Sequence, residues 1–298
     1  MHLVTYIKPD NTDAQHLGVL AESGQAVIDL ADAVPGVPAT MLGLIEDGPS
    51  ALASLREALA SDSDRLPLTE VRLLAPIPRP PRNVFCVGKN YREHAQEVSG
   101  AGQGLWGDAD EPTVPIIFTK APSAVIGTGA PIPASSDPTD SVDYEGELAV
   151  VIGAGGRGIT KAEAMEHVFG YTILNDATSR RLQKEHQQWF IGKSLDGFCP
   201  MGPALVTRDE IPDVGALRVQ TRVNDELRQD GSVSDLIFDI PTLIETLSRT
   251  MTLEPGDIIA TGTPAGVGMG FKPPRYLHPG DRVAITIEPI GTLENPVG

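Results

Sequence analysis

The sequence predicts a β-rich α+β fold, and three observations favour it. Most apolar stretches are short and bounded by glycine or proline, which is typical of buried strands. Glycine (31) and proline (26) are abundant in the 298 residues and indicate many turns, while 41% hydrophobic residues suffice for a large core. Apolar residues recur at helical spacing in only a few segments, so we expect short helices outside a mixed sheet.

Residues 1–75 are expected to form a small N-terminal α/β domain. His2–Ile7 alternates between apolar and polar residues, and two apolar runs flank Glu22–Gln25 as in a hairpin. Helical spacing follows between Ala39 and Ala60. The stretch up to Arg82 is rich in proline and predicts a stiff connector, with a second domain over residues 76–298. The alternative is that these prolines mark an edge of one domain.

Charge and cysteine content exclude several classes of partner. A net charge of −17 disfavours nucleic acid and anionic membrane surfaces. Cys86 and Cys199 lie in apolar contexts, so we expect two buried, reduced thiols. No segment has the pattern of a leader peptide or the length of a membrane span. We therefore expect a soluble, cytoplasmic protein that acts on a small molecule.

The most informative stretch is Asp143–Gly153, whose second half is typical of a buried strand. Glu145 and Glu147 are two residues apart, so on a strand they would point to the same face. Two carboxylates beside a hydrophobic strand repel each other and resist dehydration unless a cation compensates them. A hard divalent metal ion would do so. The alternative is a strand end that reaches solvent.

Other polar residues follow predicted elements in a definite order. The apolar strand Tyr171–Asp176 ends in an acid. Tyr91–Val98 predicts a short helix on which His94 and Glu97, three residues apart, share a face. Downstream come Gln183, Trp189–Ser194 and Thr261–Gly268. Over roughly residues 75–298 this ordered set resembles the fumarylacetoacetate hydrolase family, in its acylpyruvate hydrolase and hydroxymuconate isomerase branch.

The resemblance implies a fold and a metal site. It implies a rolled mixed β-sheet in the catalytic domain and a homodimer. It also implies that Glu145, Glu147 and Asp176 bind Mg²⁺ or Mn²⁺, which prefer oxygen ligands. Cysteines and histidines with zinc-site spacing are absent from the sequence. The open metal positions would receive an α-keto acid and stabilise its enolate, which serves C–C hydrolysis, decarboxylation and isomerisation alike.

The resemblance assigns roles to other residues as well. His94, oriented by Glu97, is expected to activate water as a general base. Lys193 and Gln183 are expected to meet the developing oxyanion. The glycine- and acid-rich segment Ser99–Glu111 is expected to act as a lid. Substrate contacts are expected from Tyr91, Arg180, Gly262 and Thr263.

These expectations favour a metal-dependent hydrolase of acylpyruvate-like 2,4-diketo acids. An isomerase of the 2-hydroxyhepta-2,4-diene-1,7-dioate type, or an oxaloacetate decarboxylase, is the alternative on the same scaffold. Gly153–Gly158 has the spacing G-x-G-x-x-G, which is typical of dinucleotide-binding sites. A dinucleotide-binding oxidoreductase is therefore a further, more distant alternative. Thr160 and Glu163 argue against it, because they predict a helix that begins after the glycines. A metal-free binding protein is a further alternative.

Overall fold

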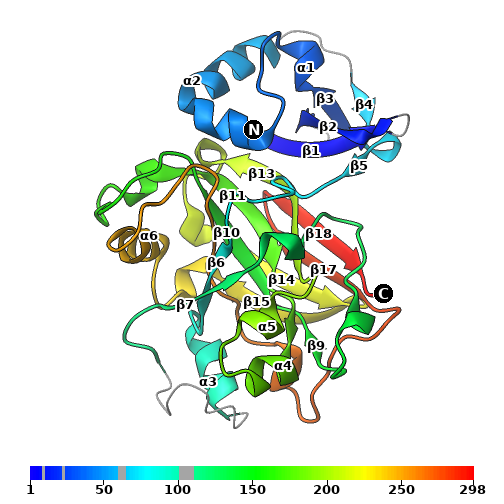
Figure 1. Cartoon of the computed structure of the whole chain (residues 1–298), viewed down its shortest axis with the longest axis vertical. Helices are drawn as coiled ribbons and strands as arrows, with labels where there is room; N and C mark the ends of the chain where they lie inside the picture. Colours follow the sequence, from blue (N-terminus) through cyan, green and yellow to red (C-terminus); the bar gives the residue numbers. More distant parts are fainter. Residues whose placement is uncertain (9–10, 22–23, 60–64, 101–110) are drawn as a thin grey trace.

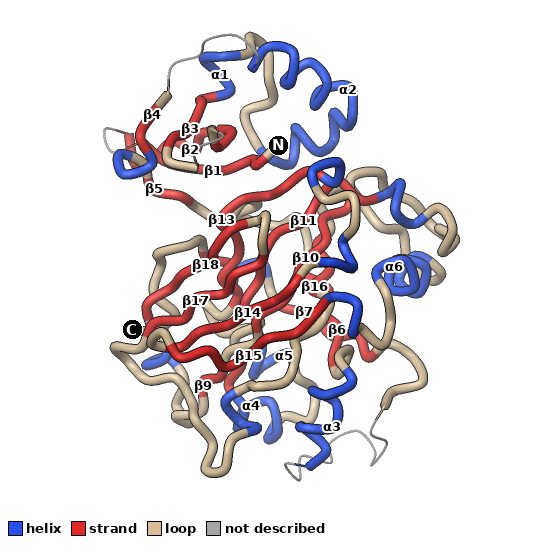
Figure 2. Tube along the Cα trace, turned by 180° about the vertical axis from the view of Figure 1, so that it is seen from behind, coloured by secondary structure: helices blue, strands red, loops and turns tan. Residues whose placement is uncertain are grey.

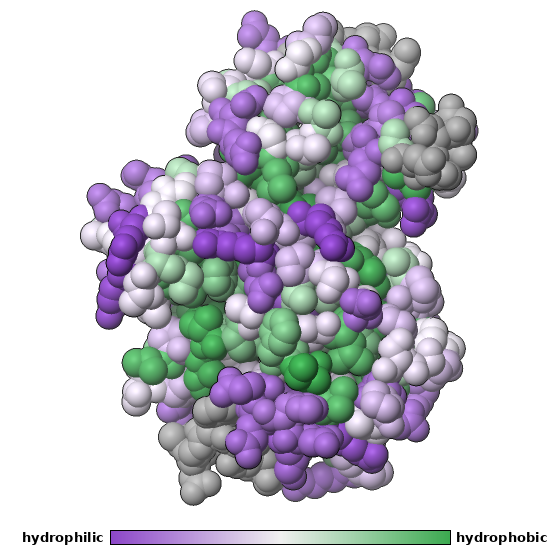
Figure 3. All heavy atoms as spheres, in the orientation of Figure 1, coloured by the Kyte–Doolittle hydropathy of each residue, from purple (hydrophilic) through white to green (hydrophobic). Residues whose placement is uncertain are grey.

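The computed structural model describes residues 1–8, 11–21, 24–59, 65–100 and 111–298. Strands β1–β5 and helices α1 and α2 form one end of the molecule, and α3, α4 and α5 lie near the opposite end (Figure 1). On the face drawn in Figure 3, hydrophobic residues form patches across the middle of the larger part, and hydrophilic residues gather below them. Within the described ranges, no helix is long and apolar enough to cross a membrane.

A large, mostly antiparallel sheet runs through the whole molecule (Figure 2). Two short strands join it at the side, where β5 (Arg72–Leu73) pairs with β1 and β8 (Val125–Ile126) pairs with β13. Among the labelled strands of the described residues, only the pairs β16–β6 and β13–β8 are parallel. In spatial order the main strands are β4 (Leu66–Pro67), β3 (Ala26–Asp29), β2 (Asn11–Leu20), β1 (His2–Lys8), β13 (Cys199–Thr207), β11 (Val168–Asn175), β10 (Gly146–Ile152), β16 (Ile258–Ala260), β6 (Val84–Gly88) and β7 (Ile116–Lys120).

A second sheet packs against the middle of the first. Its order is β15 (Glu226–Ser232), β14 (Arg218–Val223), β17 (Arg282–Ile287) and β18 (Gly291–Pro296). The sheets approach closely at Gly146, where a Cβ atom would lie 2.3 Å from Oγ1 of Thr221. Leu148, Val150 and Ile285 belong to the buried core between them. A third pair, β9 (Val142–Asp143) with β12 (Thr178–Ser179), flanks the acidic residues described below.

The helices are short and lie outside the sheets, as expected. The longest, α2, bends at Gly48, whose φ of 70° suits glycine. The α-helices are α1 (Leu30–Ala33), α2 (Met41–Leu59), α3 (Arg92–Gly100), α4 (Arg180–Glu185), α5 (Phe190–Lys193) and α6 (Ile240–Ser248). The 3₁₀ helices are η1 (Leu68–Glu70), η2 (Pro122–Ala124), η3 (Ala134–Ser136), η4 (Ala164–His167), η5 (Arg208–Glu210), η6 (Val214–Ala216), η7 (Val233–Asp235) and η8 (Gly268–Gly270).

The β-rich α+β class is confirmed, and so are the N-terminal hairpin of β2 with β3 and the strand that follows Glu145. Cys86 and Cys199 are buried free thiols, as expected. The helix expected directly after Thr160 was wrong, because a turn intervenes before the 3₁₀ helix η4 begins at Ala164. The N-terminal strands share the large sheet through the pairing of β1 with β13. The domain boundary near residue 75 stays a prediction.

Candidate metal and substrate site

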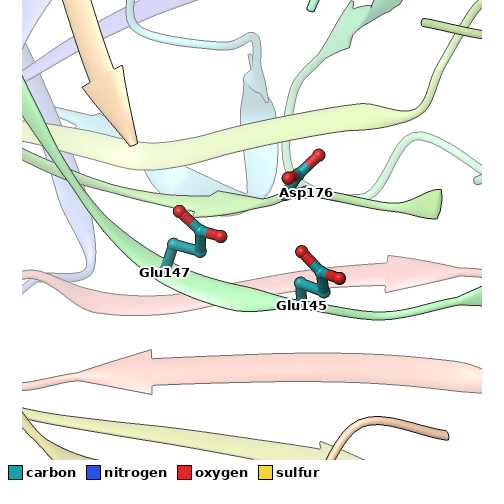
Figure 4. Close-up of side chains that lie close together, drawn as sticks. All are labelled: Glu145, Glu147 and Asp176. Carbon is teal, nitrogen blue, oxygen red and sulfur yellow. The ribbon is translucent and has the colours of Figure 1, made fainter. Parts of the chain in front are cut away.

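Three buried carboxylates meet beside the pairing of β10 with β11. Glu145 directly precedes β10, Glu147 lies within it, and Asp176 directly follows β11. Gly146 pairs with Asn175, which brings the two strand ends together, and the Asp176 amide donates to the Glu145 carbonyl at 2.9 Å. Each carboxylate offers an oxygen within 4.8 Å of the others. Figure 4 shows them pointing toward one another, and we call them the acidic triad.

Two fully buried lysines neutralise part of the acidic triad. Lys193 Nζ lies 2.8 Å from Oε2 of Glu145 and 2.7 Å from Oδ2 of Asp176. Lys120 Nζ lies 2.6 Å from Oδ1 of Asp176 and donates to the Ala177 carbonyl at 3.0 Å. Burial alone would lower the pKa of Lys193, but these two carboxylates raise it above its ordinary value. Lys193 therefore carries a positive charge inside the protein.

Arg180 connects the acidic triad to a fourth acid, Asp143. Its Nε donates to Oδ2 of Asp143 at 2.8 Å, and Nη1 lies 2.6 Å from Oε1 of Glu145. The backbone amides of Gly268 and Met269 also donate to Asp143, at 2.7 and 3.0 Å. Arg180 Nη2 is buried and has no hydrogen-bond partner among the residues that the structure describes. Arg180 is therefore held firmly while one of its donor groups is left for another molecule.

Glu147 is the least neutralised member of the acidic triad. Its Oε2 accepts a hydrogen bond from the Gly262 amide at 2.8 Å, but among the described residues no cationic side chain pairs with it. Burial, followed by repulsion from Asp176 and Glu145, raises its pKa well above the ordinary value. Burial would also raise the pKa of Glu145, but Lys193 and Arg180 lower it.

The donor atoms of this site fit a divalent cation. Asp143 and the acidic triad carry four negative charges when ionised, and three cationic side chains, Lys120, Arg180 and Lys193, pair with them. The acidic triad offers only oxygen donors, which lie close together and are buried. Mg²⁺ and Mn²⁺ prefer oxygen ligands. The residues of the acidic triad therefore suit the metal ion that the sequence led us to expect.

His94 and Glu97 form a dyad on α3, as their spacing predicted. His94 Nδ1 lies 3.1 Å from Oε2 of Glu97. Glu97 Oε1 accepts from the Gly266 amide at 3.0 Å, and a Cβ atom at Gly270 would lie 2.1 Å from the same oxygen. Glycines thus let the backbone approach and hold Glu97, which in turn fixes the imidazole of His94. This arrangement leaves Nε2 as the nitrogen able to exchange a proton with a ligand.

A pocket opens over the acidic triad and brings together most of the residues singled out from the sequence. Seven of them line it, namely His94, Glu145, Glu147, Arg180, Gln183, Lys193 and Thr263. The other lining residues are Val87, Gly88, Lys89, Val98, Phe118, Trp189 and Met269. Four other predicted residues, Tyr91, Glu97, Asp176 and Gly262, are not part of this lining. The catalytic, substrate-binding and metal-binding roles of all these residues stay predictions.

Thr263 and Gln183 lie in the pocket wall with defined partners. Thr263 Oγ1 donates to the Gly146 carbonyl at 2.9 Å and accepts from Gln229 at 2.7 Å. Gln183 Oε1 accepts from Arg180 Nη1 at 3.4 Å. Tyr91 is not part of the pocket wall, and its buried hydroxyl has no hydrogen-bond partner within the described ranges. Of the expected lid Ser99–Glu111, residues 101–110 lie outside the described residues.

Sequence reasoning missed two residues at this site. Lys120 ends the apolar strand β7, and Asp143 lies within the stretch that we singled out, but neither was assigned a role. A lysine at the end of an apolar strand was the available signal for Lys120. The glycine-rich turn after β10 was interpreted correctly as a turn, because Gly156 pairs with Leu253 through both backbone hydrogen bonds.

The chain is similar to characterised proteins over most of its length. A family model for the C-terminal part of fumarylacetoacetate (FAA) hydrolase matches residues 83–298. Oxaloacetate tautomerase YisK of Bacillus subtilis (strain 168) is 53% identical over 270 residues, which cover 88% of this chain and 87% of that protein. Fumarylacetoacetate hydrolase from the psychrophilic Exiguobacterium antarcticum is 46% identical, with a TM-score of 0.82 over 100% of this chain and 99% of that one.

A further solved structure bears on the metal site. Maleylpyruvate hydrolase from Sphingobium sp. SYK-6, in complex with manganese(II) and pyruvate, is 33% identical and has a TM-score of 0.78. The alignment covers 100% of this chain and 98% of that one. Together with the family model over residues 83–298, these relatives confirm the resemblance found in the sequence. The chain is a member of the fumarylacetoacetate hydrolase family.

Proposed function

We propose that this protein is a divalent-cation-dependent tautomerase that interconverts the keto and enol forms of 2-oxo acids such as oxaloacetate. The observation that carries the proposal is the pocket that His94 lines together with Glu145, Glu147, Arg180 and Lys193. The similarity to an oxaloacetate tautomerase, at 53% identity, supports the isomerase alternative better than the hydrolase that we placed first. Both the tautomerase and the hydrolase would act on an oxo acid.

The acidic triad would hold the cation, either Mg²⁺ or Mn²⁺. When bound, such an ion supplies a Lewis acid for the oxygen atoms of the substrate. The manganese(II) and pyruvate in the related maleylpyruvate hydrolase support this choice of cation and of an oxo acid. The protein contributes a buried setting in which Lys120, Arg180 and Lys193 hold Glu145 and Asp176 in place through ion pairs.

Tautomerisation moves one proton and leaves every other atom of the substrate in place. A proton leaves the carbon next to the 2-oxo group, and another joins the 2-oxo oxygen. His94 can exchange the carbon-bound proton through Nε2, because Glu97 occupies Nδ1. The Lys193 ammonium pairs with two carboxylates and retains a third N–H donor. Arg180 Nη2 has no partner in the described part of the chain. Both can bind oxygen atoms of the substrate.

Hydrolysis of a 2,4-diketo acid is the second candidate. It is favoured by the same dyad, because a histidine held by a glutamate can activate water as well as exchange a carbon-bound proton. Hydrolysis adds water across the broken C–C bond, so its products differ from those of tautomerisation. Product analysis therefore separates the two reactions directly.

The test compares two substrates at saturating Mg²⁺ or Mn²⁺. The ultraviolet absorbance of enol oxaloacetate is followed as the enol converts to the keto form, and acetylpyruvate is incubated and analysed by chromatography for pyruvate and acetate. We expect the protein to accelerate ketonisation of oxaloacetate and to release little pyruvate from acetylpyruvate. Rapid release of pyruvate with no acceleration of ketonisation would reverse the order of the two candidates. Inactivity in both assays would reject both.

A further inference from the structure

Lys89 is a cation of the pocket wall that the proposed reaction does not use. It directly follows β6 and lines the pocket with His94, Arg180 and Lys193. Its side chain is buried, with 9% exposed. Within the described part of the chain, its ammonium takes part in no hydrogen bond or ion pair. The ammonium is not among the buried polar atoms that lack a hydrogen-bond partner, so solvent reaches it through the pocket. An anion that enters the pocket can take the place of this water and form a charge-assisted hydrogen bond with Lys89.

The other cations of the pocket, unlike Lys89, already form ion pairs with acids of the protein. Lys193 contacts Glu145 and Asp176, and Arg180 contacts Asp143 and Glu145. These contacts neutralise acids of the protein itself. Lys89 is different, because its charge remains available to a ligand.

The backbone holds Lys89 in this position. Its φ is 54°, in the left-handed region that residues other than glycine seldom adopt. The next residue, Asn90, donates to the carbonyls of Phe238 at 3.0 Å and Thr261 at 2.7 Å, and accepts from the Phe238 amide at 2.8 Å. On the other side, a Cβ atom at Gly88 would lie 2.5 Å from the indole of Trp189. The turn that carries Lys89 is therefore fixed from both sides.

Resting on the proposed function, we infer that Lys89 binds the distal carboxylate of a dicarboxylic 2-oxo acid and so selects such acids over monocarboxylic ones. The first carboxylate and the 2-oxo group of the substrate would be bound at the acidic triad with its cation. A second carboxylate that enters this pocket gives up its water, and pairing with a cation of the pocket wall compensates that loss. Lys89 supplies that charge, and a substrate that ends in an alkyl group has no use for it.

The test measures binding and does not depend on turnover. 2-Oxoglutarate and 2-oxopentanoate have the same chain length and differ in the distal group, a carboxylate in the first and a methyl in the second. Isothermal titration in the presence of Mn²⁺ should show that the wild type binds 2-oxoglutarate more tightly by roughly 10- to 100-fold, the usual effect of one charged hydrogen bond. Lys89→Met should remove this preference, and Lys89→Arg should retain most of it.

Lys184→Met is the matched control, because Lys184 is exposed on α4 and its loss changes the net charge equally. It should leave the preference intact. The inference would be overturned if the wild type did not prefer 2-oxoglutarate. It would also be overturned if the preference survived in Lys89→Met, or if that variant bound both ligands more weakly by the same factor. The proposed function is tested by a different result. If the protein shows the Lys89-dependent binding preference but does not accelerate ketonisation, the proposed function is wrong and the inference about Lys89 stands.

Discussion

The ammonium of Lys120 lies 2.6 Å from Oδ1 of Asp176, and both side chains are fully buried. Removing one partner of a buried ion pair leaves an uncompensated charge, which typically costs about 3–5 kcal/mol. We therefore expect Lys120→Met to lower the free energy of unfolding of the metal-free protein by about that amount, measured by urea denaturation. Arg218→Met breaks an exposed ion pair with Asp230 and should change the free energy of unfolding little. Equal losses in the two variants would contradict the importance of the buried pair.

Glu147→Gln tests the member of the acidic triad that has no cationic partner among the described residues. The substitution keeps the size of the side chain and removes its charge, so Mn²⁺ should bind more weakly. Loss even of an outer partner of a metal ligand costs about 10- to 100-fold in affinity, and we expect at least that reduction here. Isothermal titration with Mn²⁺ measures it, and Glu185→Gln, on the exposed end of α4, is the control. Unaltered Mn²⁺ affinity in Glu147→Gln would exclude Glu147 as a ligand.

His94→Ala tests the proton-transfer step. A positioned general base contributes roughly two to four orders of magnitude, so the turnover number for ketonisation of oxaloacetate should fall by that factor. Affinity for Mn²⁺ should persist, because His94 contacts Glu97 and none of the acidic triad. Glu97→Gln should reduce the rate less, since it leaves the imidazole in place. A variant that lacks His94 and turns over like the wild type would remove the dyad from the mechanism.

Asp29 makes the stability of the N-terminal region depend on pH. Although burial opposes ionisation, Lys8 and Tyr6 lower the pKa of Asp29 below its ordinary value of 3.8. Lys8 Nζ and the Tyr6 hydroxyl lie 2.8 and 2.6 Å from Oδ2 of Asp29. A lowered pKa stabilises the folded state above the unfolded-state value, and this contribution is lost as the pH falls through the folded-state value.

Asp29→Asn should therefore be less stable than the wild type by a constant amount above about pH 5, where the acid is ionised in both states. The difference should shrink as the pH falls below 3.8. Urea denaturation of both proteins across this range measures it. A difference that stays constant down to the most acid pH would show that ionisation of Asp29 does not contribute.

Local pattern predicted those site residues whose position depends on a single strand or helix. Glu147 begins an apolar run, Asp176 ends one, and His94 with Glu97 shares a helix face, so their spacing was informative. Glu145 differs slightly from expectation, because it precedes β10 and is placed by the Asn175 side chain, which accepts from its amide at 3.0 Å.

Contacts between distant segments were beyond the reach of local pattern. Lys120 meets Asp176 across 56 residues of sequence. Lys89 becomes a pocket residue only because Asn90 is tied to Phe238 and Thr261 on other segments. The helix expected after Thr160 also failed for a local reason, since Thr160 Oγ1 contacts the Glu163 side chain at 2.6 Å within a turn. The capping-box pattern of Thr160 and Glu163 therefore does not begin an α-helix at this position.

The most direct test of the central claim is the rate of oxaloacetate ketonisation by metal-stripped protein as Mn²⁺ is added, after subtraction of the rate in protein-free solution. The account predicts a low initial rate that rises to a plateau near about one equivalent of Mn²⁺ per chain, as expected when one site is filled. A variant with alanine at Glu145, Glu147 and Asp176 should show no such rise. Full activity in the metal-stripped protein, or the same rise in the triple variant, would contradict the claim that the acidic triad binds the catalytic cation.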